Sequence, residues 1–449
     1  MGNALSRTGT AGRRISFKYD PESAMPSTDD EPEPPEPPPE PPAEPRLAES
    51  VLERIPTYLQ PPIPWRDRIL HFTFAWYTVT MSTSGIALTL AITPHRFPGL
   101  SAIGLAIFLL DLVSFLLITA AILLRFALYR RTVTRAFTRP SEALFVPTLF
   151  LSVAAILSNI DEYARLYLSE AQVVSLERGF LRVAFWVYVA ACFALSVGQY
   201  HLLFTVKETR RLLPSAMTPG WLMPILPVML AGSVAATCVR GLEGGEAVGV
   251  LCAGLAAQGL GFLVSAFMYA TYLSRLMAFG LPAQRPGMFI AVGPPSFTCA
   301  ALVGMAVEVP RVLGELVGDR GIEAAGVWAG LGDVDVETLG AAVRLMALFS
   351  AVFLWGLSFW FFSSASAAVV AGMPDRKFHL SWWSFVFPNV GFTLASIRLG
   401  AALGSEGVLW FSTVMTAFLF LAWAFIAFRC VRAVYMREIV WPGHDEDSG

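Results

Sequence analysis

Charge is scarce in this chain, and the shortage decides its class. Only 15% of the 449 residues are Asp, Glu, Lys or Arg, whereas soluble domains carry about 25%. Hydrophobic residues make up 55%, and the mean hydropathy is +0.58. The net charge of −2 lacks the basic excess of nucleic-acid-binding proteins. The sequence therefore predicts an integral membrane protein with no nucleic-acid partner.

Motifs for catalysis and cofactor binding are also missing. The chain has no GxGxxG, Walker or Cys/His metal-ligand pattern, so it is expected to be neither an enzyme nor a cofactor protein. Its five cysteines lie in or beside apolar runs without paired spacing, which favours small apolar fillers over disulfides or metal ligands. The polar N-terminus predicts that no signal peptide is cleaved.

The composition divides the chain into three parts. Residues 1–64 are predicted to be a disordered cytosolic tail, because its Pro/Glu run EPEPPEPPPEPPAEP cannot build a core. The first residues, MGNALS, fit the myristoylation pattern at Gly2, although this short pattern has many chance matches. Residues 65–435 form the predicted membrane domain, and residues 436–449 form a short cytosolic tail.

Ten apolar segments are near or above the roughly 20 residues needed to cross a bilayer. They are 71–91, 101–128, 144–160, 181–205, 221–240, 247–273, 287–307, 343–370, 380–402 and 408–434. Basic and acidic connections alternate between them, which predicts an even number of spans with both termini cytosolic. A long Gly-rich external loop is expected from 308 to 342.

The spans alternate in kind as well. Odd spans carry helix breakers and hydroxyls, whereas even spans lack proline and consist mostly of Leu, Ala, Phe and Val. The predicted helix breaks lie at Gly85, Pro147, Pro224, Pro227, Pro294, Pro295 and Pro388. This pattern predicts five helical hairpins in an all-α membrane fold, with odd helices lining a central pore and even helices outside. Proline and hydroxyls can also serve helix packing alone, which explains any one span but not the alternation.

The ninth span, WWSFVFPNVGFTLASIR, carries the strongest functional signal. Phe387 and Arg398 share one helical face, separated by eleven residues, or roughly 16 Å at 1.5 Å per residue. An aromatic plug with a cation beyond it suggests an anion path. Arg398 can bind a carboxylate with two hydrogen bonds. The alternatives are an interfacial arginine and an ordinary packed phenylalanine.

Other polar residues are further candidates for the path. Hydroxyls and amides can bind an anion weakly enough to release it, although bonding to their own helix carbonyls is equally plausible. The candidates are Thr80, Ser82, Thr83, Ser84, Ser296, Thr298, Asn389 and Thr393. His71 and Asp111 are candidates for a proton or anion site, with an interfacial histidine and a helix-contact carboxyl as the alternatives.

Four motifs resemble the tellurite-resistance/dicarboxylate transporter family, most closely the fungal malic acid transport proteins. They are FAWYTVTMSTSGIAL, PGWLMPILPVMLAG, RPGMFIAVGPPSFT and WWSFVFPNVGFTLASIR, and the resemblance covers about residues 65–435. It implies ten helices, a homotrimer with a pore in each protomer, and a pore-blocking phenylalanine. Phe387 matches that position, with Phe385 as the competing choice.

The resemblance also implies a function: transport of C4-dicarboxylates such as malate and succinate, coupled to protons, across the plasma membrane. A passive anion channel and a sulfite efflux pump share the same frame and remain alternatives. A membrane scaffold or sensor using the proline-rich tail is the alternative from another class.

Overall fold

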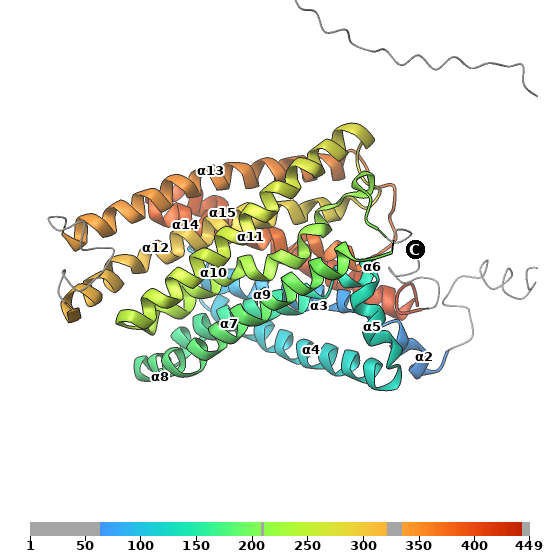
Figure 1. The fold of residues 1–449 in the computed structure, drawn as a ribbon, viewed down its shortest axis with the longest axis horizontal. Coiled ribbons are helices and arrows are strands. Elements are labelled where there is room, and N and C mark those ends of the chain that lie inside the picture. Colours follow the sequence, from blue (N-terminus) through green and yellow to red (C-terminus); the bar gives the residue numbers. More distant parts are fainter. Residues whose placement is uncertain (1–62, 208–210, 321–334, 442–449) are drawn as a thin grey trace, which may run out of the picture. The chain divides into compact units, whose positions relative to one another are not determined.

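The computed structural model describes residues 63–207, 211–320 and 335–441, and the side chains of 316–320 are excluded from the description. These residues are almost entirely helical and contain no strand. Nine helical segments within them are long and apolar enough to cross a membrane (Figure 1). The expectations for residues 1–62, including Gly2 and the Pro/Glu run, lie outside this part of the chain.

The predicted hairpins correspond to five pairs of long helices. The bounds are α3 Tyr77–Ile92 with α4 Leu100–Leu128, α7 Pro147–Tyr167 with α9 Arg182–Phe204, α10 Leu226–Cys238 with α11 Gly244–Phe279, α12 Gly293–Arg320 with α13 Val336–Val370, and α14 Phe387–Leu403 with α15 Glu406–Tyr435. The short helices are α2 Trp65–Leu70, α5 Arg131–Thr138, α6 Pro140–Ala143 and α8 Glu170–Leu176. The 3-10 and π segments are η2 Phe74–Trp76, η3 Glu177–Leu181, η5 Pro214–Ala216, η6 Pro219–Ile225, η7 Val239–Gly241, η8 Arg285–Val292 and η11 Leu380–Phe385.

The first helix of each pair belongs to an inner ring. Helix α3 packs on α7, α7 on α10, α10 on α12, α12 on α14, and α14 again on α3. Each inner helix also packs on its hairpin partner. The odd–even alternation in the sequence therefore separates an inner ring from outer helices, as predicted.

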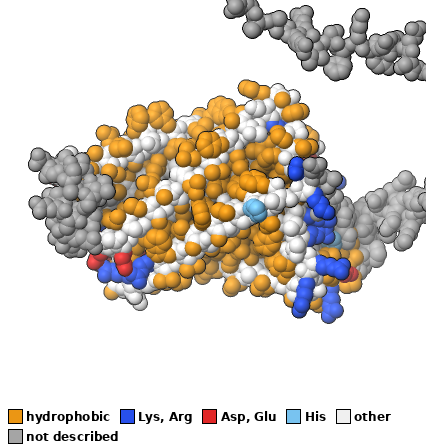
Figure 2. Space-filling view, viewed as in Figure 1, with side chains coloured by type: hydrophobic (Ala, Val, Ile, Leu, Met, Phe, Trp, Pro, Cys, Tyr) orange, Lys and Arg blue, Asp and Glu red, His pale blue; other side chains and the backbone are white. Residues whose placement is uncertain are grey.

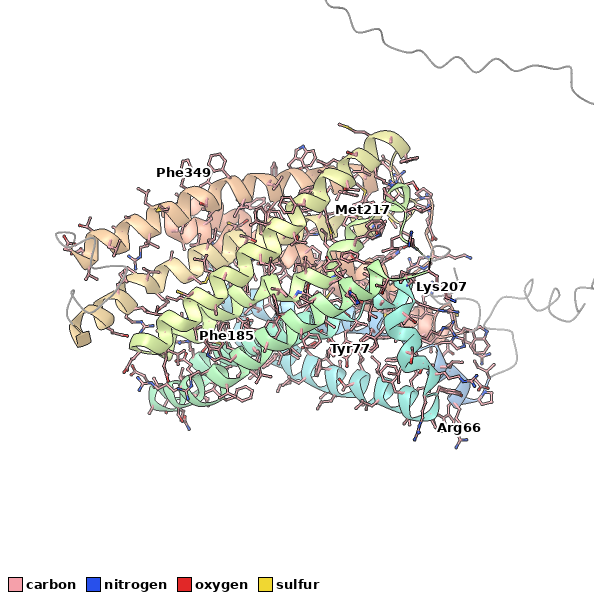
Figure 3. The ribbon with its side chains drawn as sticks, in the orientation of Figure 1. Arg66, Tyr77, Phe185, Lys207, Met217 and Phe349 are labelled. Carbon is pink, nitrogen blue, oxygen red and sulfur yellow. The ribbon has the colours of Figure 1, made fainter. Side chains whose placement is uncertain are left out.

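Burial confirms this division. In the α10 span, 94% of the residues in the most apolar stretch are buried, whereas only 22% are buried in α13. Figure 3 shows Phe349 of α13 pointing outward, and this side chain is 67% exposed. Figure 2 shows hydrophobic side chains over most of one face, with Lys and Arg gathered at the end that carries α2 and α5. Such apolar outer faces are expected against lipid.

The prolines predicted as helix breaks lie at or just before the starts of the inner helices rather than in mid-span. Pro147, Pro227, Pro294 and Pro388 all lie in the first turn of an α-helix, where a backbone N–H has no helical partner. Pro295 follows Pro294, and Pro224 lies inside η6. Segments η2, η6, η8 and η11 directly precede or lead into α3, α10, α12 and α14. Four of the five inner helices are therefore each built from a 3-10 segment followed by an α-helix.

Gly85 differs from the predicted break. Helix α3 runs through it without interruption, and a Cβ at this position would lie 3.0 Å from a Val390 methyl group. Gly85 therefore permits close packing of α3 on α14 instead of a bend.

Among the described residues, helical segments long and apolar enough to cross a membrane correspond to nine of the ten predicted spans, all but the first. The expected span 71–91 is divided among the end of α2, η2 and α3, and α3 has only 16 residues. It is almost fully buried inside the ring, so it does not need a lipid-facing apolar surface of full length.

Several helices extend beyond their predicted ends. Helix α7 continues to Tyr167, and α12 continues to Arg320, through the first part of the expected 308–342 loop. At the C-terminal end, Ile439 and Trp441 are buried, so the packed domain extends past residue 435. Salt bridges and hydrogen bonds stabilise these polar extensions, which a hydropathy pattern cannot detect.

Candidate functional site

A small cavity lies inside the inner ring. Its volume is about 40 Å³, and all five inner helices contribute to its wall. The lining residues are Gly85, Leu88, Ile92, Ala154, Ala155, Ser158, Glu162, Leu230, Ser233, Val234, Thr237, Phe297, Ala300, Phe387, Val390, Leu394 and Arg398. A cavity needs about 10–15 Å³ to hold one water, so this one admits a few waters and excludes a four-carbon dianion. The path is closed in this conformation.

Two phenylalanines from different helices narrow the path. Phe387, the first residue of α14, is 5% exposed and faces Phe297 of α12, with ring centroids 5.2 Å apart. Gly391 makes room for the second ring, because a Cβ there would lie 2.7 Å from Phe297. Phe385 instead packs on Phe289 and does not line the cavity. Of these two candidates, only Phe387 lines the cavity.

Sequence reasoning did not identify Phe297. It lies between the noted Ser296 and Thr298, in a stretch that was interpreted only by its prolines and hydroxyls. The signal that could have found it is its spacing from Pro294, because a residue three positions on shares the face of a helix's first turn.

Arg398 is the only basic residue among those lining the cavity. Its Nη1 donates a hydrogen bond of 2.7 Å to the Ala300 carbonyl. Gly304 provides space for the guanidinium, because a Cβ there would overlap it. In the described part of the chain, no carboxylate lies within 4.0 Å of Arg398. Glu162 of α7 also lines the cavity but pairs with Arg240, so no direct ion pair neutralises Arg398 and its guanidinium can bind an anion.

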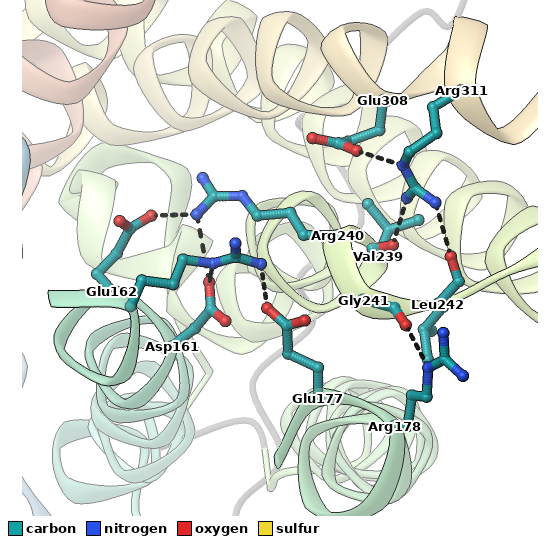
Figure 4. A network of polar contacts seen from close by, with 11 residues as sticks. Asp161, Glu162, Glu177, Arg178, Val239, Arg240, Gly241, Leu242, Glu308 and Arg311 are labelled. Atoms are coloured by element: carbon teal, nitrogen blue, oxygen red, sulfur yellow. Dashed lines mark hydrogen bonds and ion pairs between the residues drawn. The ribbon is translucent and has the colours of Figure 1, made fainter. Parts of the chain in front are cut away.

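The arginines that connect the ends of α7, η3 and η7 have acidic partners (Figure 4). Arg240 lies 2.8 Å from Glu162 and 3.3 Å from Asp161, while Arg165 pairs with Asp161 and Glu177. The charges of this cluster are paired with one another. The cluster therefore joins the ends of α7, η3 and η7 rather than binding a solute.

A second group of contacts continues the network. Arg311 lies 3.1 Å from Glu308 and 2.9 Å from Glu315, and donates hydrogen bonds to the carbonyls of Val239 and Leu242. These contacts fix α12 to η7. The sequence placed Glu308 and Glu315, like Asp161 and Glu162, in external loops, and this was wrong because all four residues are helical.

The hydroxyl and amide candidates all lie outside the cavity wall. Many bond within or between helices, for example Thr80 with Ser152 at 2.8 Å, and Thr298 with Gln258 at 2.8 Å. The remaining partners are Ser82 with the Trp383 carbonyl, Thr83 with Val79 and Trp423, Ser84 with Asn159, Ser296 with Val292, Asn389 with Phe385, and Thr393 with Asn389. These residues hold the ring together.

Different hydroxyls face the cavity. They belong to Ser158, Ser233 and Thr237. Ser158 and Thr237 donate to carbonyls of their own helices, at 3.1 Å each, whereas the Ser233 hydroxyl has no hydrogen-bond partner. A free hydroxyl can donate to an anion. The i, i+4 spacing of Ser233 and Thr237 was the available sequence signal, in a span interpreted only by its prolines.

The two titratable candidates occupy different places. His71 caps α2 at the end rich in Lys and Arg, outside the cavity lining. Asp111 of outer helix α4 is fully buried, and neither of its carboxyl oxygens has a hydrogen-bond partner. The Ser84 hydroxyl of α3 is its polar neighbour.

A ring of broken helices around a small cavity, with two phenylalanine rings and one arginine in its wall, defines a helical membrane protein with an internal cavity. The chain belongs to the voltage-dependent anion channel family, which it matches over residues 71–431. Two malic acid transport proteins of Schizosaccharomyces pombe are 33% and 30% identical to it, each over 86% of this chain and 85% or 84% of their own length. A sulfite efflux pump of Trichophyton rubrum is 23% identical over 82% of this chain and 93% of its own length. The family and the relatives' names indicate transporters or channels rather than enzymes.

Proposed function

We propose that this protein carries C4-dicarboxylate anions such as malate and succinate across the membrane, along the axis of the inner ring. The observation that carries this proposal is Arg398, which lines a five-helix cavity, donates to a backbone carbonyl and forms no ion pair within the described residues. Two relatives named as malic acid transport proteins, each aligned over most of both chains, support the substrate class.

The inner helices add a second attraction for anions. All five α-helical parts run in one chain direction, because each is followed by an outer helix that returns. The positive ends of their dipoles therefore face the side from which the 3-10 segments enter. Helix α14 begins at Phe387 itself, so an anion at the constriction lies at the positive end of this helix and then meets Arg398.

Phe387 and Phe297 form the proposed gate. Their paired rings leave no room for a dicarboxylate, so transport requires at least one ring to rotate away. Ser233 then offers its free hydroxyl to the passing anion.

Asp111 is the proposed proton carrier. A buried carboxyl that has no cationic partner among the described residues, and only a serine hydroxyl beside it, is costly as an anion, which favours its proton-bearing form. The Ser84 hydroxyl of α3 lies beside Asp111 and accepts a hydrogen bond of 2.9 Å from Asn159 of α7. This hydroxyl therefore connects Asp111 to both inner helices. Protonation there can influence the packing of α3 on α7.

The sulfite efflux relative supports a second candidate, export of a smaller anion through the same path. A homotrimer in the plasma membrane, with both termini cytosolic, completes the proposal. The Lys and Arg gathered at one end agree with that orientation.

Uptake of radiolabelled malate into proteoliposomes tests the function. Uptake stimulated by an inward proton gradient and inhibited by succinate is expected. Leak of nitrate or chloride that malate does not inhibit would make the protein a passive channel. Transport of sulfite without uptake of malate would favour the second candidate.

The Asp111→Asn variant tests the coupling, because it preserves side-chain size and removes the titratable group. It is expected to retain malate exchange and lose stimulation by the gradient. Asp335→Asn, at an exposed helix N-cap far along the chain, serves as the control. Gradient stimulation equal to that of the unmodified protein in Asp111→Asn would remove Asp111 from the coupling step.

A further inference from the structure

A second, larger cavity lies at the side of the helix bundle. Its volume is about 780 Å³, within the range of about 300–1,000 Å³ typical of ligand sites. Its lining residues are Arg68, Trp76, Val79, Thr83, Leu110, Ser114, Trp383, Trp423, Ala427, Cys430, Val431, Val434, Tyr435 and Arg437. We call this cavity the lateral groove. It shares no lining residue with the ring cavity and takes no part in the proposed path.

The lateral groove opens toward the lipid-facing side. Its outer walls come from the outer helices α4 and α15, where Leu110, Val431 and Tyr435 are exposed. Its inner wall comes from η2, α3 and η11. A solute in water cannot reach such an opening without entering the bilayer, whereas a lipid chain lies beside it.

The polar groups of the lateral groove lie where a lipid headgroup would be. Arg68 belongs to α2, and Arg437 follows the end of α15, so both come from the end where Lys and Arg gather (Figure 2). Tyr435 lies beside them. Tyr and Trp favour the boundary between headgroups and acyl chains, and basic pockets between membrane helices recognise anionic lipid headgroups.

The inner wall contains an unsatisfied polar group. Trp383 is buried, and its Nε1 has no oxygen or nitrogen partner; its polar neighbour is the Cys430 thiol, a weak acceptor that also lines the groove. By contrast, the neighbouring Trp423 Nε1 donates to Thr83 at 3.0 Å. A buried donor without a partner is unfavourable. An ester or phosphate oxygen inside the lateral groove would satisfy it.

We propose that the lateral groove binds an anionic phospholipid from the leaflet at the basic end. Its phosphate contacts Arg68 and Arg437, and one acyl chain lies between α4 and α15. Trp383 precedes Phe387 by four residues in the chain. The bound lipid therefore supports η11, the segment from which the gate helix α14 begins.

Native mass spectrometry and thermal unfolding of the full chain in detergent test the proposal. After delipidation, added phosphatidylserine is expected to bind at one high-affinity site per protomer and to raise the unfolding temperature. Phosphatidylcholine and inorganic phosphate are expected to do neither. The double variant R68Q/R437Q should bind phosphatidylserine at least tenfold more weakly, while Arg131→Gln, which removes an exposed charge at the same end, should bind it normally.

A second pair of variants tests the acyl-chain site. Ser114 lies in the lateral groove, and Ser350 lies on the exposed face of α13; each hydroxyl donates to a carbonyl four residues earlier. Ser114→Trp should abolish high-affinity binding and Ser350→Trp should not. Equal effects of phosphatidylserine and phosphatidylcholine, or equal binding by all variants, would refute the proposal. Cross-linking of Ser114→Cys to Val431→Cys between protomers would show that a second copy covers the groove, which also refutes it.

Discussion

Replacing Arg398 by glutamine tests the anion path most directly. Glutamine can keep a hydrogen bond to the Ala300 carbonyl but loses the positive charge in the ring cavity. A hydrogen bond to a charged group contributes about 1.5–3 kcal/mol. Since 1.4 kcal/mol corresponds to a factor of ten in affinity, the malate concentration for half-maximal uptake should rise roughly 10- to 150-fold.

The assay is the concentration dependence of malate uptake into proteoliposomes, with protein amounts matched. Arg96→Gln is the control, because Arg96 also donates to carbonyls near the same end of the ring but does not line the cavity. The malate concentration for half-maximal uptake by Arg398→Lys should lie between those of Arg398→Gln and Arg96→Gln, since lysine keeps the charge and lacks the planar guanidinium. An unchanged concentration dependence in Arg398→Gln would refute the proposed role of its charge.

Three further variants test the gate and the scaffold. Phe387→Ala removes one ring of the constriction and should raise anion flux, measured as proteoliposome uptake and planar-bilayer current; no change in either would exclude it as the gate. Gly391→Ala introduces a Cβ 2.7 Å from the Phe297 ring, an overpacking of about 1–3 kcal/mol that should destabilise the closed pair and raise flux in the same assays. A flux equal to that of the unmodified protein would show that close packing of residue 391 on Phe297 does not hold the two rings together. Glu142→Gln leaves the buried Arg125 without its carboxylate partner and should lower the free energy of unfolding by about 3–5 kcal/mol, measured by denaturant titration; a loss under 1 kcal/mol would contradict a buried ion pair there.

The separation of inner and outer helices was predictable because it depends on composition. A helix against lipid needs an apolar surface and tolerates few breakers, whereas a helix inside the ring can satisfy freed backbone groups through its neighbours. Phe387 and Arg398 were predictable for a related reason. Both belong to one helix, so their shared face follows from the helical repeat alone.

Helix ends were less predictable. Hydropathy ends a span at the first charges, yet Asp161 and Glu162 continue α7 because Arg240 from a different hairpin neutralises them. The same reasoning explains why α12 continues past Glu308, which is paired with Arg311 on the same helix. A hydropathy window counts such residues only as charges, whereas their pairing depends on geometry and, for Arg240, on a partner from another hairpin.

The sequence by itself determined the membrane class, the five hairpins, the inner and outer helices, and the common face of Phe387 and Arg398. Only the tertiary structure decided which hydroxyls face the cavity, that Phe297 meets Phe387, and that Arg398 pairs with a backbone carbonyl rather than a carboxylate. The physical reason is that each of these properties depends on contacts between helices. A serine bonded to a neighbouring helix and a serine free to donate, such as Ser84 and Ser233, are the same residue until those contacts are known.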